Sequence, residues 1–168
     1  MKILLMRHAE AMDRSPKKFP DDKLRPITKT GQKKTEEAAR ALSKLEKRVD
    51  LILSSPLTRT QQTANIMRKG MHLSKEHLVL SDFLAPLGDL DALMEQIRKM
   101  DAFSTILLVG HEPELGELIS ILLSGERTLQ IEMKKGSICC LTADDLTTGK
   151  CATLEWLLTP GQLSKLYQ

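Results

Sequence analysis

Three short runs along the chain are apolar without interruption. They cover residues 3–6 (ILLM), 51–53 (LIL) and 106–109 (ILLV). A strand with one solvated face alternates apolar and polar residues, whereas a strand in a parallel sheet is covered on both faces and is apolar throughout. The three runs therefore predict neighbouring strands of a buried, mainly parallel sheet.

Between these runs, apolar residues recur every three or four positions, which is the spacing of one face of a helix. One predicted helix follows the Thr-x-x-Gly sequence at residues 28–31. Another runs from Pro56 to about Arg68, with Ser55 as its N-cap and Gly70 just past its end. The apolar stripes are Ala38, Leu42, Leu45 and Val49; Leu90, Leu93, Met94 and Ile97; and Leu115, Leu118, Ile119 and Leu122. This alternation of strands and helices predicts an α/β fold.

The last part of the chain has a different pattern. In residues 151–156, Ala152, Leu154 and Trp156 alternate with Cys151, Thr153 and Glu155, as in a strand with two unlike faces. The turn sequence Asp-Asp-Leu-Thr-Thr-Gly separates this segment from residues 138–142, so the two segments predict a hairpin at one edge of the sheet. We predict a three-layer α/β sandwich with a mainly parallel central sheet, as a single domain over residues 1–168.

Composition narrows the possible partners. The net charge of +3 arises from 25 basic and 22 acidic residues spread along the chain, without the dense basic stripe expected of a nucleic-acid-binding surface. No apolar run approaches the ~18 residues of a membrane span, and the N-terminal run is too short for a signal peptide. Three cysteines cannot all pair and indicate reduced thiols. We expect a cytoplasmic protein with no nucleic-acid or membrane partner. We also expect a monomer, because nothing in the sequence requires a larger assembly.

Cationic side chains follow three of the predicted strands. They are Arg7 and His8 after the first, Arg59 in the helix after the second, and His111 after Gly110 at the end of a later strand. The carboxyl ends of parallel strands meet at one edge of a sheet, where ligands bind and where helix N-termini add partial positive charge. The four side chains therefore predict a site for an anion, most simply a phosphate. His72 and His77 lie among polar residues and are expected at the surface.

Five motifs around these residues resemble the histidine phosphatase superfamily. They are RHAE at 7–10, LRPITKTG at 24–31, SSPLTRTQQT at 54–63, VGHEP at 109–113 and WLLTP at 156–160. The short chain, with no helical insert between the motifs, is similar to the SixA-type phosphohistidine phosphatase branch. The resemblance implies a phosphoglycerate-mutase-like fold without a large helical insert. It also implies a phosphatase that needs no metal or other cofactor and acts on a phosphorylated histidine of a protein, such as a signalling phosphotransfer domain.

The resemblance also assigns roles to the four residues. It implies that His8 is the nucleophile that becomes phosphorylated, while Arg7, Arg59 and His111 hold the phosphoryl group. A neutral imidazole is available near pH 7, and arginine matches the oxygens of phosphate with two donors. Two arginines and a protonated His111 would neutralise the transferring group, which is the main requirement of phosphoryl transfer.

Three positions leave alternatives open. Ala9 replaces the glycine of the usual Arg-His-Gly, and activity survives if this position needs only a small residue. Asp89 is the candidate general acid, although it suits equally well as the N-cap of the following helix. Arg25 either reaches the phosphate or substrate, or pairs with Asp21 or Asp22.

Other functions compete with a protein phosphohistidine phosphatase. The same mechanism could act on a small phosphate ester. A metal hydrolase could use His8 and His111 as ligands beside Glu10 and Glu112, although the neighbouring arginines would repel a metal ion; otherwise these glutamates orient the site or favour a helix start. A catalytically silent phosphate-binding module is the remaining alternative, if Ala9 displaces the nucleophile.

Overall fold

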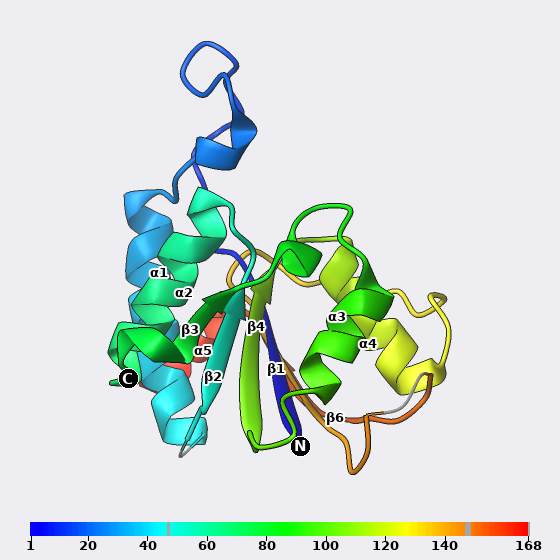
Figure 1. Cartoon of the computed structure of the whole chain (residues 1–168). Coiled ribbons are helices and arrows are strands. Elements are labelled where there is room, and N and C mark those ends of the chain that lie inside the picture. Colours follow the sequence, from blue (N-terminus) through cyan, green and yellow to red (C-terminus); the bar gives the residue numbers. More distant parts are fainter. Residues whose placement is uncertain (47, 147–148, 168) are drawn as a thin grey trace.

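A computed structural model of the chain describes residues 1–46, 48–146 and 149–167 (Figure 1). Within them, a six-stranded sheet has the order β3-β2-β4-β1-β5-β6. The strands are β1 (Lys2–Arg7), β2 (Leu51–Ser54), β3 (Leu78–Leu80), β4 (Thr105–Gly110), β5 (Ile138–Thr142) and β6 (Thr153–Leu158). The four strands from β3 to β1 are parallel, and β5 and β6 add an antiparallel hairpin. The predicted mainly parallel sheet and edge hairpin are confirmed.

Helices cover both faces of this sheet (Figure 1). Their bounds are α1 (Lys29–Leu45), α2 (Thr58–Gly70), α3 (Leu90–Arg98), α4 (Glu114–Ser124) and α5 (Pro160–Tyr167), with short 3-10 turns η1 (Asp22–Leu24), η2 (Lys75–His77) and η3 (Asp82–Leu84). Helices α1, α2 and α5 lie on one face, and α3 and α4 on the other. The predicted three-layer sandwich is therefore confirmed. None of the described helices is both long and apolar enough to cross a membrane.

The continuous apolar runs are explained by two cores, one on each face of the sheet. Successive side chains of a strand point to opposite faces. Ile3 and Leu5 belong to the core under α3 and α4, whereas Leu4 and Met6 belong to the core under α1 and α2. All four are fully buried, so a polar residue anywhere in this run would lose its contact with water.

Two local predictions are wrong. Helix α2 begins at Thr58 with Leu57 at its N-cap, and Gly70 is its last residue rather than the residue after its end. The hydroxyl of Ser55 accepts only a long bond from the amide of Leu57, at 3.4 Å, and its shorter contact is with His111, as described below. Helix α1 ends at Leu45, so Val49 packs in the same core from outside the helix.

The two ends of the segment from residue 8 to residue 28 are joined to each other. Ala11 and Ile27 form an antiparallel bridge, and the amide of Thr28 donates to the carbonyl of Glu10 at 2.9 Å. Gly31 permits this approach, because a Cβ at that position would lie 2.3 Å from the Glu10 carbonyl oxygen. The segment therefore carries η1 to the carboxyl end of the parallel strands.

Candidate active site

The predicted site residues meet at the carboxyl ends of β1, β2 and β4. Arg7 lies beside Gly110 in the sheet register, and Ser54 lies beside Val109. A cavity of about 390 Å³ opens here. It is lined by five cationic side chains, two acidic ones and both predicted histidines: Arg7, Arg14, Arg25, Arg59, Lys135, Asp13, Glu112, His8 and His111. Such a surplus of positive charge favours an anionic ligand.

His8 is held with one ring nitrogen free to react. Its Nδ1 lies 2.7 Å from the carbonyl oxygen of Ala9. A carbonyl only accepts hydrogen bonds, so Nδ1 must carry the proton, which leaves the lone pair on Nε2. Burial, together with the positive charges of Arg59, Arg7 and Arg25, lowers the pKa of His8 to about 4, although the Ala9 bond opposes this shift. The side chain is therefore a neutral imidazole near pH 7.

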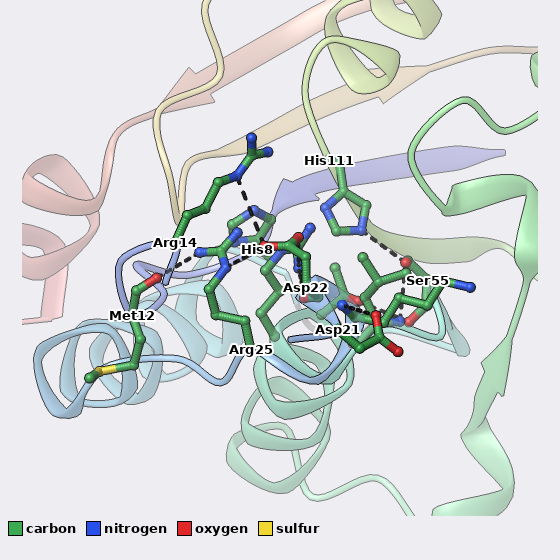
Figure 2. Close-up of polar contacts among 12 residues, drawn as sticks. His8, Met12, Arg14, Asp21, Asp22, Arg25, Ser55 and His111 are labelled. Atoms are coloured by element: carbon green, nitrogen blue, oxygen red, sulfur yellow. Dashed lines mark hydrogen bonds and ion pairs between the residues drawn. The ribbon is translucent and has the colours of Figure 1, made fainter. Parts of the chain in front are cut away.

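His111 is fixed by a residue whose role the sequence did not reveal. Its Nε2 lies 2.9 Å from Ser55 Oγ, and both residues are buried (Figure 2). The rings of His8 and His111 are tilted, with their centroids 5.1 Å apart. Burial, together with the cationic surroundings, lowers the pKa of His111 to about 3. Desolvation disfavours the charged imidazolium, so this pKa favours a neutral His111 near pH 7 and disagrees with the expectation of a protonated side chain.

Arg7 and Arg59 present buried donors that are unused. The Arg7 side chain donates to the carbonyl of Met133 at 2.8 Å, and Arg59 donates to the carbonyl of Asp22 at 3.1 Å. The Nε atoms of both arginines are buried and have no hydrogen-bond partner within the described part of the chain. Both arginines line the cavity, so a phosphate oxygen bound there can accept from the donors of their guanidinium groups.

Asp22 binds the outer edges of two arginines. Its carboxylate lies 2.8 Å from Arg25 Nε and 3.2 Å from the Arg59 guanidinium, and the exposed Arg14 approaches within 3.9 Å (Figure 2). The hydrogen bond from Arg25 lowers the pKa of Asp22, so the carboxylate is ionised. Arg25 also donates to the carbonyl of Met12 at 2.7 Å. Thus Arg25 both pairs with Asp22 and lines the cavity, whereas sequence reasoning set these roles against each other.

Asp89 is not brought to this cavity. It caps α3, and its Oδ1 accepts from the amides of Asp91 at 2.9 Å and Ala92 at 3.0 Å. This arrangement matches the N-cap interpretation. The carboxyl groups that do line the cavity are those of Asp13 and Glu112, and burial raises the pKa of Glu112 to about 7 although Arg7 opposes the shift.

Ala9 adopts an ordinary backbone conformation. Among the described residues with a side chain, only His72 and Leu87 have a positive φ. The amide of Ala9 donates to Thr63 Oγ1 at 3.0 Å, and its methyl group is buried. The position therefore demands a small residue rather than the conformational freedom of glycine.

The described residues include no group of three or more His, Cys, Asp or Glu side chains placed to hold a metal ion. The ligand set needed for the metal-hydrolase alternative is thus not assembled in that part of the chain. What the geometry offers is a neutral imidazole surrounded by arginine donors, an arrangement that suits an anionic ligand.

Comparison with known proteins identifies the class that this fold and site define. The model of the histidine phosphatase superfamily (branch 1) matches residues 3–79, a region that contains His8, Arg7, Arg25 and Arg59. The chain belongs to the histidine phosphatase superfamily.

Particular relatives extend this match along the chain. An uncharacterized protein of Picosynechococcus sp. is 32% identical over 140 residues, which are 82% of each protein. The phosphohistidine phosphatase SixA of Escherichia coli is 25% identical over 166 residues, or 97% of this chain and 96% of SixA.

Solved structures share the fold at lower identity. A structure of the protein histidine phosphatase SixA complexed with tungstate has a TM-score of 0.85 and 24% identity, covering 97% of this chain and 99% of that one. A putative alpha-ribazole-5'-P phosphatase from Escherichia coli has a TM-score of 0.73 and 17% identity, covering 95% and 98%. The fold is thus shared by one protein named as a protein histidine phosphatase and another named as a phosphatase of a small phosphate ester.

Proposed function

We propose that this protein is a phosphohistidine phosphatase that acts on a phosphorylated protein through a covalent intermediate on His8. The observation that carries the proposal is the neutral His8 imidazole, with Nε2 unprotonated, beside the buried and unpartnered Nε donors of Arg7 and Arg59. A nucleophile and unused anion donors at one cavity are what a phosphoryl-transfer site requires.

In the first step, His8 Nε2 attacks the phosphorus atom of the substrate. A bond forms between Nε2 and phosphorus while the bond from phosphorus to the substrate imidazole breaks, and that imidazole leaves with a proton. Arg7 and Arg59 donate to the equatorial oxygens, with Asp22 holding the far side of the Arg59 guanidinium at 3.2 Å. These fixed donors stabilise the charge of the transition state.

In the second step, water attacks phosphorus and the bond to His8 Nε2 breaks. The products are inorganic phosphate and the free His8 imidazole. His111 lies beside this reaction, with its ring centroid 5.1 Å from that of His8. Its Nε2 is hydrogen-bonded to Ser55, so its Nδ1 is left to form a hydrogen bond with a phosphoryl oxygen or with the attacking water.

The similarity to SixA over nearly the whole chain supports a protein substrate. A leaving imidazole also needs less help from an acid than an alcohol does, because its second nitrogen can be protonated in advance. This suits a cavity that Asp89 does not reach. A small phosphate ester is the second candidate substrate, and the shared fold of the putative alpha-ribazole-5'-P phosphatase favours it.

The proposal is tested by measuring phosphate release from two substrates in the presence of EDTA. One substrate is a generic aryl phosphate, and the other is a histidine-containing phosphotransfer domain that has been phosphorylated with phosphoramidate. We expect turnover that survives chelation, and a phosphoenzyme that can be trapped by acid-free quenching. His8→Ala abolishes both.

The control variant is His72→Asn, because His72 is an exposed histidine whose positive φ asparagine tolerates. It should behave as the wild type. Loss of activity with EDTA would overturn the mechanism, and phosphate binding without turnover would indicate a silent module. Preference for the aryl phosphate over the phosphoprotein would replace the protein substrate with a small ester.

A further inference from the structure

Leu87 presents its whole side chain to solvent beside the catalytic cavity. It is 96% exposed and has a φ of +63°. A left-handed conformation is unfavourable for a leucine, and full exposure gives up the burial that usually places leucine in a protein. An outlier that combines both features next to a reaction site is a reason to look for a function.

Specific contacts hold Leu87 in this position. Its amide donates to Glu114 Oε1 at 2.7 Å, and Glu114 lies in the first turn of α4, three residues after His111. The next residue closes the loop, because the amide of Gly88 donates to the carbonyl of Ala85 at 2.9 Å. A Cβ on Gly88 would lie 2.1 Å from the carbonyl oxygen of Phe83, so the loop requires glycine there. The orientation of Leu87 is therefore built into the fold.

The loop stands at the mouth of the cavity. Pro86 lines the cavity, whereas Leu87 does not. In Figure 1 the loop before α3 rises at the same end of the sheet as the segment between β1 and α1. That segment carries Met12, which lines the cavity, and Leu24; they are 37% and 65% exposed. The lining of the basic cavity thus includes the apolar Met12 and Pro86 from two separate segments.

We propose that Leu87 is a docking contact for the protein that carries the phosphohistidine, and so selects a protein substrate over a small phosphate ester. This inference rests on the proposed function. A small ester held within the cavity is bound by the lining residues, and Leu87 is not one of them. A protein surface that delivers its phosphohistidine to His8 extends past the rim and covers Leu87. A fully exposed leucine held in a left-handed conformation gains burial when such a surface covers it.

The test variant is Leu87→Asn, because asparagine removes the apolar side chain and tolerates a positive φ. The control is Leu154→Asn on β6, where the leucine is 45% exposed and belongs to the antiparallel hairpin. For the phosphorylated phosphotransfer domain, we expect Leu87→Asn to lower kcat/KM by roughly 10- to 100-fold, mainly through KM. For the aryl phosphate, kcat/KM of the same variant stays within about twofold of wild type, and Leu154→Asn matches wild type on both substrates.

The outcomes separate this inference from the proposed function. If the wild type hydrolyses both substrates and Leu87→Asn equals it on both, the docking role is wrong and the phosphatase stands. Equal losses on both substrates would also overturn docking, because they would show that the loop acts on the catalytic residues. If the wild type hydrolyses only the aryl phosphate, the proposed protein substrate fails and the docking role fails with it.

Discussion

Replacing Ser55 by alanine should impair catalysis through His111. The hydroxyl lies 2.9 Å from His111 Nε2, and the two residues are 0% and 3% exposed. Removing it leaves a buried ring nitrogen without its partner, which costs about 1–3 kcal/mol. If the same interaction is required in the transition state, kcat/KM falls roughly 5- to 150-fold. The same loss of stability lowers Tm by about 2–12 °C for a chain of this size.

A neighbouring serine provides a matched control. Ser54 is equally buried, and its hydroxyl donates to the carbonyl of Ser55 at 2.9 Å. That carbonyl also accepts from Thr60 Oγ1 at 2.9 Å, so Ser54→Ala leaves no buried acceptor unpaired. Its expected cost is about 0.5–1.5 kcal/mol of stability, with kcat/KM unchanged. Steady-state kinetics on the aryl phosphate and thermal unfolding measure both variants. Equal kinetics for Ser55→Ala and Ser54→Ala would refute the assigned role of Ser55.

Three further predictions concern charge. Arg59→Lys removes the planar fork and the buried Nε donor, so kcat/KM should fall about 100- to 1,000-fold with the fold intact by circular dichroism; a loss below tenfold would contradict this role. Because the folded-state pKa values of His8 and His111 lie below the ordinary 6.5, the unfolded chain binds more protons at acidic pH. The free energy of unfolding should therefore fall as pH drops from about 6.5 to about 3, less steeply in His111→Gln, and parallel profiles would refute this. Glu112 has the opposite effect on the free energy of unfolding, since its pKa is raised to about 7. Its contribution to stability is complete below pH about 4.5 and is lost as pH rises through 7. Glu112→Gln should then gain Tm over wild type at pH 8 but not at pH 4, and an equal difference at both would count against it.

The sequence predicts the core of the fold because the parallel strands are apolar on both faces. It does not predict β3, whose three residues include the exposed Val79 and Leu80. Nor does it predict α5, a short helix of eight residues that follows β6 directly. Short elements of this kind are defined by their neighbours in space rather than by periodicity.

The candidate site is predicted to the extent that it depends on strand ends. The meeting of His8 and His111 follows from parallel topology alone. In contrast, the bonds of Ser55 to His111 and of Asp22 to Arg59 join residues far apart in sequence, and no spacing rule reveals them, whereas the local pairing of Asp22 with Arg25 is among the alternatives that the sequence offers. Serine before proline is typical of a helix start, so the sequence predicts Ser55 as a cap. The motif at residues 54–63 includes Ser55 but does not show that it contacts His111. The charge of His111 depends on burial, which only the folded structure defines.

The backbone around the catalytic dipeptide determines when activity can arise during folding. The amide of Gly136 donates to the carbonyls of both Arg7 and His8 at 3.1 Å, and the Arg7 side chain binds the carbonyl of Met133, 126 positions later. Loops this long close late, because their entropy must be overcome before the contacts form. On the mechanism proposed above, a nascent chain that already includes His8 therefore remains inactive until more than three quarters of its length has been synthesised. Regained phosphatase activity would report completed folding of the sheet, rather than early collapse of β1 to β4.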